Sequence, residues 1–351
     1  MASEGTRTIG VAQLGCGYWG PNLLRNLIQE PRADVRWVAE PAETRRAYVG
    51  RTYPGTPLTA DWKEALADPS VQAVVIATPA STHFDLAHAA LEAGKHVLVE
   101  KPLATSVGEV ETLRASAESR SRVLMVGHTF LFSPAVRMTR ALLDKGELGD
   151  LYYMYSQRLN LGQVRADVNV WWNLAPHDVS IFLHLAKGTL PAEVAVRGVD
   201  YLQPGVEDVV FATLRWPDRL MANLHASWLD PGRVRRLTLV GSRKMLVYDD
   251  VEDSKIAIVD KGVDRVPRLG DRMDYDRPPV HRLQQRMGDI VLPKVDNAEP
   301  LAQEIAHFLD CIESGARPLT DARHARDVVA VLEAGAHSLK RGGAFVPVSS
   351  D

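Results

Sequence analysis

The chain has 351 residues, of which 46% are hydrophobic and 24% charged; this composition excludes predominant disorder, and the length suits two domains. Its 41 Lys and Arg against 44 Asp and Glu give a formal net charge of −3, so its bulk charge attracts neither nucleic acid nor an anionic membrane. Cys16 and Cys311 cannot form a disulfide framework, and no apolar run reaches the length of a signal peptide or membrane span. We therefore expect a cytoplasmic protein with no nucleic-acid or membrane partner.

The first part of the chain alternates short apolar runs with segments of helical period, a pattern typical of a parallel sheet covered by helices. Strands are predicted at 8–14, 35–39, 71–77, 96–99 and 123–126. One helix is predicted to follow a glycine-rich segment, with Pro21 in its first turn. Another is predicted from about His83 to Gly94.

The second part has a different pattern, because its strands are separated by short turn signals that suit antiparallel pairing. Strands are predicted at 151–161, 194–200, 208–216, 221–228, 235–240, 244–249 and 255–259, with one helix at 176–185. The segment 267–295 has weak periodicity and is predicted to be a long loop. Two helices, at 300–314 and 322–340, are predicted to close the chain.

The glycine-rich segment contains Gly15-x-Gly17-x-x-Gly20, with Tyr18 and Trp19 between the last two glycines. A strand precedes it, a helix follows it, and Glu40 lies twenty residues after the last glycine. This arrangement predicts a dinucleotide site, in which the loop approaches a pyrophosphate and Glu40 accepts hydrogen bonds from a ribose. The alternative is an ordinary strand-to-helix turn with a solvated Glu40.

The choice between NAD and NADP depends on the side chains beside this ribose. A carboxylate at Glu40 repels a 2′-phosphate and favours NAD. Arg45 and Arg46 follow closely and could turn toward such a phosphate, or could simply be exposed on a helix. NAD is therefore the expected cofactor, with NADP as the alternative.

Lys101 lies just after the carboxyl end of a predicted parallel strand, where open α/β sheets bind ligands. A lysine beside a nicotinamide ring would lose protons more easily and could relay a hydroxyl proton. A surface lysine after a strand is the alternative.

The segment 171–178 (WWNLAPHD) supplies the second candidate group. If a helix begins near Asn173, with Pro176 in its first turn, Asn173 and His177 share one face. His177 could then take a hydroxyl proton. The alternatives are that Asn173 is an N-cap and that His177 is a buried, hydrogen-bonded histidine. His177 and His184 are seven residues apart and could share a helix face with Asp178 nearby, but no third ligand has suitable spacing, so no metal site is expected.

The sequence resembles the Gfo/Idh/MocA family of oxidoreductases. The resemblance rests on the glycine loop, on Thr78-Pro79 with Thr82-His83, on 93–97 leading to Glu100-Lys101-Pro102, and on the closing helix around 300–312. It implies an N-terminal Rossmann domain with a doubly wound parallel sheet (1–128). It also implies a C-terminal domain built on a large, mainly antiparallel open sheet (129–351), whose last helices could pack back on the first domain. The outer face of that sheet usually mediates homodimers or homotetramers.

The resemblance also implies residue roles. Lys101 matches the active-site lysine and His177 the histidine usually assigned as general base, while Asn173 stands where the family typically has aspartate. An asparagine can orient a hydroxyl but cannot relay a proton as a carboxylate does, which leaves Lys101 and His177 as the expected catalytic pair. The other cofactor-binding residues are expected to be Gly15, Gly17, Tyr18, Trp19, Gly20, Glu40, Thr78, Pro79, His83 and Glu100, and the substrate-binding residues Asn173, His128, Asp178, Trp172 and Arg158.

Finally, the resemblance implies hydride transfer between NAD and a hydroxyl or keto carbon of a sugar. The segments 126–130 and 173–178 look like those of a branch associated with nucleotide sugars, so a nucleotide-linked hexose, oxidised at C3, is the expected substrate. A cyclitol or free-aldose dehydrogenase is the alternative enzyme. A non-catalytic NAD-binding regulatory protein is the alternative of another class, although such a protein would be expected to have lost Lys101 and His177.

Overall fold

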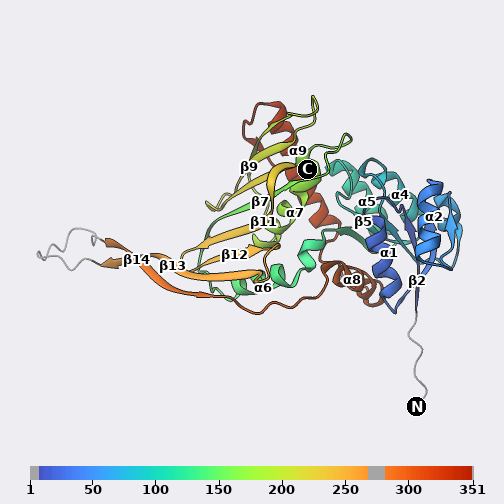
Figure 1. Ribbon diagram of the computed structural model, residues 1–351, viewed down its shortest axis with the longest axis horizontal. Coiled ribbons are helices and arrows are strands. Elements are labelled where there is room, and N and C mark those ends of the chain that lie inside the picture. The colour runs from blue at the N-terminus through green and yellow to red at the C-terminus, as the bar shows by residue number, and fades with distance from the viewer. Residues whose placement is uncertain (1–7, 268–280, 350–351) are drawn as a thin grey trace, which may run out of the picture.

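A computed structural model describes residues 8–267 and 281–349 and contains two β-sheets with helices packed on them (Figure 1). The first sheet has six parallel strands in the order β3-β2-β1-β4-β5-β6. Its strands are β1 (Ile9–Leu14), β2 (Ala33–Ala39), β3 (Leu58–Thr59), β4 (Ala73–Ile76), β5 (His96–Glu100) and β6 (Leu124–Gly127). The helices between them are α1 (Gly20–Gln29), α2 (Glu43–Thr52), α3 (Trp62–Ala67), α4 (His83–Glu92) and α5 (Val107–Ser119). This confirms the doubly wound Rossmann sheet.

Both faces of the first sheet are covered, as its continuously apolar strands require. Ile9 and Val11 pack with α1 and with α8 (Pro300–Ser314) on one face. Ala12 and Leu14 pack on the other face with α3, α4, α5 and α9 (Ala322–Lys340). The two closing helices have the predicted bounds and lie on opposite faces of the N-terminal sheet.

The second sheet has nine strands in the order β14-β13-β12-β11-β7-β10-β9-β8-β15. They are β7 (Leu151–Leu161), β8 (Glu193–Val199), β9 (Val209–Arg215), β10 (Met221–Ser227), β11 (Leu229–Gly241), β12 (Met245–Asp249), β13 (Ile256–Pro267), β14 (His281–Val291) and β15 (Val346–Pro347). Every pair is antiparallel except β7 with β10. The sheet is therefore mainly antiparallel, as expected, but it is not a simple meander, because β10 and β11 lie on either side of β7.

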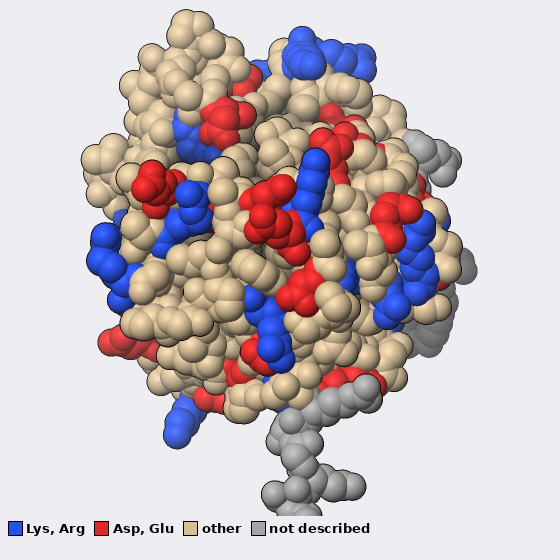
Figure 2. All heavy atoms as spheres, turned by 90° about the vertical axis from the view of Figure 1, so that its right-hand side faces the viewer, with Lys and Arg blue, Asp and Glu red and all other residues tan. Residues whose placement is uncertain are grey.

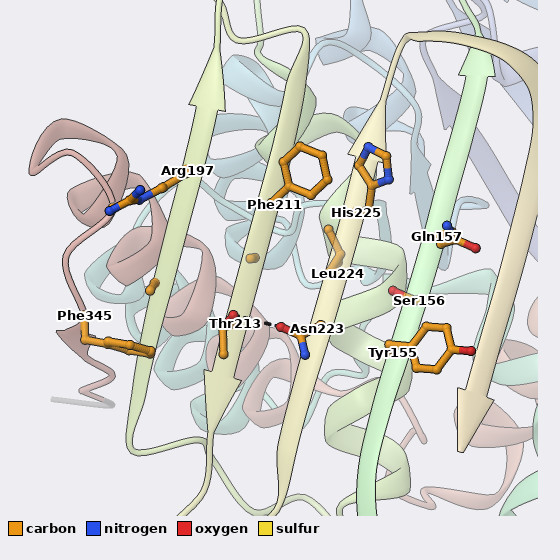
Figure 3. Close-up of a pocket in the computed structure, with 13 residues that line it drawn as sticks. Tyr155, Ser156, Gln157, Arg197, Phe211, Thr213, Asn223, Leu224, His225 and Phe345 are labelled. Atoms are coloured by element: carbon orange, nitrogen blue, oxygen red, sulfur yellow. Dashed lines mark hydrogen bonds between the residues drawn. The ribbon is translucent and has the colours of Figure 1, made fainter. Parts of the chain in front are cut away.

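One face of this sheet packs against α6 (Pro134–Asp144), α7 (Val170–Leu185) and α9, and this side holds the core of the second half. The opposite face is open. Figure 3 shows Tyr155, Phe211, Asn223 and His225 standing on it, around a shallow hollow of about 570 Å³. Tyr155 and Phe211 are 38% and 57% exposed there, so a large aromatic surface has no cover within the described chain.

Two predictions of local structure were wrong, and some elements were not predicted. Residues 281–291 form strand β14 instead of a loop, while 268–280 lie outside the described residues. The described side chains of β14 are mostly exposed, so the strand has no hydrophobic alternation; backbone pairing with β13 fixes it, and the hairpin extends away from the body (Figure 1). Helix α6 was not predicted.

The second wrong prediction concerns α7, which begins at Val170, one turn earlier than expected. Its N-cap is Asn169, whose side chain accepts a hydrogen bond from the Trp172 N–H at 3.1 Å. Pro176 consequently lies inside the helix and not in its first turn. Because proline has no N–H, it cannot donate the usual helical hydrogen bond to the Trp172 carbonyl.

The sheets change between β6 and β7, near the proposed domain boundary at residue 128, which remains a proposal. Thr320, just before α9, is tied to the last Rossmann strand, since its hydroxyl donates to the Val126 carbonyl at 2.7 Å.

Positive and negative side chains are interspersed over the face of the first half seen in Figure 2, with no broad patch of one sign. No helix in the described ranges is long and apolar enough to cross a membrane.

Candidate active site

A cavity of about 930 Å³ opens at the carboxyl ends of β1, β2, β4 and β5 and is closed from the other side by β7, α7 and β11. The residues predicted from sequence that line it are Gly15, Gly17, Tyr18, Trp19, Glu40, Thr78, Pro79, His83, Glu100, Lys101, Arg158, Trp172, Asn173 and His177. Ligands of doubly wound sheets bind at this edge, where the strand order reverses. The structure therefore brings together candidate cofactor and substrate residues from both halves of the chain.

The glycine loop has the shape that a pyrophosphate requires. Gly15 has φ +88°, and a Cβ there would lie 2.7 Å from the Ala77 carbonyl oxygen, so only glycine fits. A Cβ on Gly17 would instead have no described atom within 4 Å, which leaves open space beside the N-terminus of α1. Helix N-termini attract phosphate through unpaired N–H groups and the helix dipole. The residues present fit a dinucleotide.

Glu40 directly follows β2 and is buried, with both carboxylate oxygens already receiving hydrogen bonds. The Cys16 N–H donates to one oxygen at 2.7 Å and the Ala42 N–H to the other at 3.0 Å. A carboxylate has further lone pairs to accept from ribose hydroxyls. Arg45 and Arg46 are not free cations beside this position, because both side chains donate to backbone carbonyls. Arg45 donates to the Cys16 carbonyl at 2.9 Å, and Arg46 to the Glu40 carbonyl at 2.6 Å.

His83 links the segment after β4 to the segment after β5, which carries Lys101. Its ring nitrogens lie 2.7 Å from the Pro102 carbonyl oxygen and 3.0 Å from that of Thr78. Burial lowers the pKa of His83. We therefore describe His83 as a positioning residue, which fixes the segment after β4 against the segment after β5.

Lys101 projects from the end of β5 toward α7, and its Nζ donates to the Asn173 carbonyl oxygen at 2.7 Å. Burial lowers its pKa to about 8, the neighbouring Glu100 opposes that shift, and Arg158 adds to it. Burial raises the pKa of Glu100 to about 7. An amine with a pKa near 8 exchanges protons readily close to neutrality.

His177 lies one turn after Asn173 on α7 and also lines the cavity. Its Nδ1 is shielded from solvent and has no hydrogen-bond partner among the described residues. Its ring meets Phe130 edge-on, with centroids 5.1 Å apart. Burial, then the nearby Lys101 and Arg158 charges, hold its pKa well below the usual range, so the imidazole is neutral at physiological pH.

Asn173 is not an N-cap, as that role belongs to Asn169. The Asn173 side-chain oxygen accepts a 3.4 Å hydrogen bond from the Trp228 indole. This contact holds the amide at the cavity wall beside Lys101.

Three of the predicted site residues do not line the cavity. Gly20 begins α1 behind the loop, and His128 packs edge-on against His324 with ring centroids 5.0 Å apart. Asp178 points away and forms a buried ion pair with Arg158 at 2.5 Å. The geometry therefore gives Asp178 the role of holding Arg158, whose guanidinium lies 4.5 Å from the centre of the Phe130 ring.

The structure adds lining residues that the sequence reasoning missed, notably Phe130, Trp228, Arg233 and Arg235. The two arginines come from β11, where a strand otherwise rich in apolar residues carries several arginines, and this was the available signal. Within 8–267 and 281–349, no three His, Cys, Asp or Glu side chains are grouped as a metal site would require.

Comparison with known proteins follows the same division of the chain. Residues 9–128 match the model described as "Oxidoreductase family, NAD-binding Rossmann fold" of GFO_IDH_MocA, and residues 136–247 match the GFO/IDH/MocA C-terminal domain. Together the two models cover both the cofactor side and much of the second sheet.

Individual relatives are similar over different lengths. A scyllo-inositol 2-dehydrogenase (NAD⁺) of Bacillus subtilis is 25% identical over 97% of this chain and 96% of its own length. A UDP-N-acetylglucosamine 3-dehydrogenase of Acidithiobacillus ferrooxidans is 30% identical over 57% of this chain and 62% of its own. The structure of GenD2 from gentamicin A biosynthesis, in complex with NAD, shares the fold with a TM-score of 0.81 at 24% identity, covering 99% of each chain.

Two matching domain models, an NAD-type Rossmann loop and a cavity shared by both halves thus lead to one assignment: the chain belongs to the Gfo/Idh/MocA family of NAD-binding oxidoreductases.

Proposed function

We propose that the protein is an NAD-dependent sugar dehydrogenase, or the same enzyme working as a ketoreductase, and that its substrate is a nucleotide-linked hexose. The observation that carries this proposal is the meeting of Lys101 and His177 in one cavity with the dinucleotide loop. NAD, when bound, supplies the hydride acceptor. Glu40 favours NAD over NADP because its buried carboxylate would repel a 2′-phosphate.

Lys101 is the group best suited to take the hydroxyl proton during oxidation. Its pKa of about 8 gives a substantial neutral fraction near neutral pH, whereas the much lower pKa of His177 makes imidazole a weak base. The neutral His177 ring and the Asn173 amide would orient the hydroxyl. Asn173 carries no charge and cannot act as a carboxylate relay.

The hexose part of the proposal has two supports. The cavity extends from the Rossmann edge to the arginines of β11, beyond the residues proposed to contact the reacting hydroxyl. A relative similar over more than half of this chain is named for a UDP-sugar. The C3 position follows that relative's name. A cyclitol remains the second candidate, because a relative similar over nearly the full chain is named for scyllo-inositol.

The test is NADH formation from NAD with UDP-N-acetylglucosamine, UDP-glucose, free aldoses and inositols, followed by absorbance. We expect turnover on a nucleotide sugar, and a 10²- to 10⁴-fold loss in Lys101→Ala and His177→Ala. Turnover on inositols alone would replace the leading substrate by the second candidate. Cofactor binding without turnover in either direction, on hydroxyl or keto sugars, would favour a regulatory protein.

We also propose that the open face of the second sheet mediates a homodimer or homotetramer. The exposed aromatic side chains of β7 and β9 support this, since contiguous apolar surface of this kind usually marks an interface (Figure 3). The double variant Tyr155→Asp/Phe211→Asp should run as a monomer in light scattering, whereas Tyr48→Asp on α2 should not change the mass. A monomeric wild-type protein at micromolar concentration would contradict the proposal.

A further inference from the structure

The wall of the cavity opposite the Rossmann edge carries four arginines: Arg158, Arg165, Arg233 and Arg235. Three of them have carboxylate partners, in that Arg158 contacts Asp178 at 2.5 Å, Arg165 contacts Asp167 at 2.6 Å, and Arg235 contacts Asp250 at 3.3 Å. Arg233 has no ion-pair or hydrogen-bond partner among the described residues. Within the described chain, the Arg233 guanidinium is therefore free to bind a ligand.

The pairing of Arg235 is also incomplete. Asp250 is shared, because its other carboxylate oxygen accepts from the Tyr248 hydroxyl at 3.0 Å. Burial lowers the pKa of Arg235, and the positive charges of Arg158 and Arg233 lower it further. The four arginines of this wall have three carboxylate partners, Asp178, Asp167 and Asp250, so the wall has one more positive than negative group, and an anion entering it would relieve the repulsion.

Arg233 and Arg235 are two residues apart on β11, and both line the cavity. Each guanidinium can bind phosphate oxygens through two parallel N–H groups, so the pair offers two forks side by side. A carboxylate would need one fork, whereas a diphosphate has oxygens for both. Aromatic side chains of Phe130 and Trp172 border the same space.

We propose that Arg233 and Arg235 form a subsite for the diphosphate group of the substrate and thereby select a nucleotide-linked sugar over a neutral one. The inference rests on the proposed function for its location in a substrate cavity. It assigns specificity to two residues that play no part in hydride or proton transfer.

The subsite is tested by calorimetric titration of the full-length protein saturated with NADH, so that the pyrophosphate loop is already filled. The probes are UDP-N-acetylglucosamine, inorganic diphosphate, N-acetylglucosamine 1-phosphate and free N-acetylglucosamine. We expect both diphosphate probes to bind more tightly than the monophosphate, and the neutral sugar to bind most weakly. Affinity for the diphosphates should fall as salt is raised.

The variants Arg233→Gln and Arg235→Gln should each weaken binding of UDP-N-acetylglucosamine about 10- to 100-fold and leave the neutral sugar unchanged. Arg233→Lys keeps the charge but loses the fork, so its loss should be intermediate. Arg219→Gln, in the turn between β9 and β10, is the matched control and should bind like wild type. Circular dichroism verifies that each variant is folded.

The outcomes separate the subsite from the proposed function. Arginine-dependent binding of the diphosphate probes without NADH formation would support the subsite and count against the hydride chemistry. A neutral sugar could instead be turned over at the same rate by the wild type and by both arginine variants. That result would support the proposed dehydrogenase activity and overturn the subsite. Failure of both diphosphate probes to bind at low salt, or equal binding by the glutamine variants, would also overturn it.

Discussion

At the scale of single residues, the site depends on burial more than on residue type. Lys101 and His177 are ordinary titratable side chains, but desolvation lowers both pKa values, and the cations around them add to the effect. The result is an amine that titrates near neutrality beside an imidazole that stays neutral. This difference supports the proposal that Lys101 transfers the proton and His177 orients the hydroxyl.

The assignment predicts a pH profile. For oxidation, kcat/KM should rise with pH and level off above about 8, because the neutral amine of Lys101 accepts the proton. Lys101→Arg keeps the positive charge but cannot deprotonate. It should lose activity, and the rise of kcat/KM with pH should disappear. His177→Gln should be slower yet keep the rise near pH 8, and a rise that moved with His177→Gln would show that the histidine is the base.

A second residue-scale prediction concerns Glu304 on α8. It is fully buried, accepts from the Thr129 hydroxyl at 2.8 Å, and its other oxygen has no partner in the described chain. Burial, reinforced by the Glu100 carboxylate, raises its pKa well above 4.5. The folded state therefore holds a proton that the unfolded chain releases above about pH 4.5, so this stabilising contribution is lost as pH rises.

Glu304→Gln is isosteric and does not titrate. Its Tm relative to wild type should therefore increase from pH 5 to pH 8. Glu252→Gln, at an exposed position, should show a difference that does not vary with pH. Parallel Tm curves for Glu304→Gln and wild type would mean that Glu304 is ionised in the folded protein.

At the scale of elements, α7 determines where the proposed catalytic groups lie. Asn169 caps its first turn and also donates to Glu207 at 2.6 Å, which ties the start of the helix to the loop before β9. Inside the helix, Pro176 leaves the Trp172 carbonyl without a helical N–H. The next carbonyl, of Asn173, accepts from Lys101. The helix start and this proline together place α7 against the lysine.

Removing the cap should therefore affect both stability and catalysis. Asn169→Ala should cost about 1 kcal/mol in the free energy of unfolding and should also lower kcat/KM, because Asn173 and His177 move with the helix start. Ser106→Ala removes the equivalent cap of α5, where the serine oxygen accepts from the Glu109 N–H at 3.2 Å. That control should lose similar stability in denaturant titrations with unchanged kcat/KM, and equal kinetic effects in the two variants would contradict the argument.

At the scale of the whole molecule, α9 joins the two halves. Ala322 and Val329 pack in the core of the first half, while Val328 and Val331 pack in the core of the second. Trp171 of α7 donates its indole N–H to the Leu332 carbonyl at 2.8 Å. A Cβ on Gly335 would lie 2.3 Å from that tryptophan ring, so a glycine is needed for the close approach.

Gly335→Ala should therefore destabilise the protein by more than 1 kcal/mol, although alanine is the better helix former by about 1 kcal/mol. Gly108→Ala on α5 is the matched control, because its Cβ would meet no described atom within 4 Å. It should raise the free energy of unfolding, and a gain in both variants would show that α7 and α9 are not tightly packed.

The sequence determined those features that local patterns encode. Apolar runs predicted five of the six parallel strands, all but the two-residue β3, and the spacing of glycines together with Glu40 predicted the dinucleotide loop, because both depend on neighbours along the chain. The closing helices were predicted with the bounds that the structure has. Lys101 and His177 were singled out by their places at the end of a strand and near the start of a helix, and the resemblance to a family favoured the functional alternative for each.

Tertiary structure decided what depends on distant contacts. The strand β14 lacks a periodic pattern because backbone pairing with β13 holds it, and the parallel pairing of β10 with β7 leaves no local signal. Asp178 and Arg158 are twenty residues apart, and only folding shows that the aspartate holds the arginine instead of facing substrate. The same holds for Arg233 and Arg235, since a strand does not reveal which of its faces meets a cavity until the opposite domain is in place.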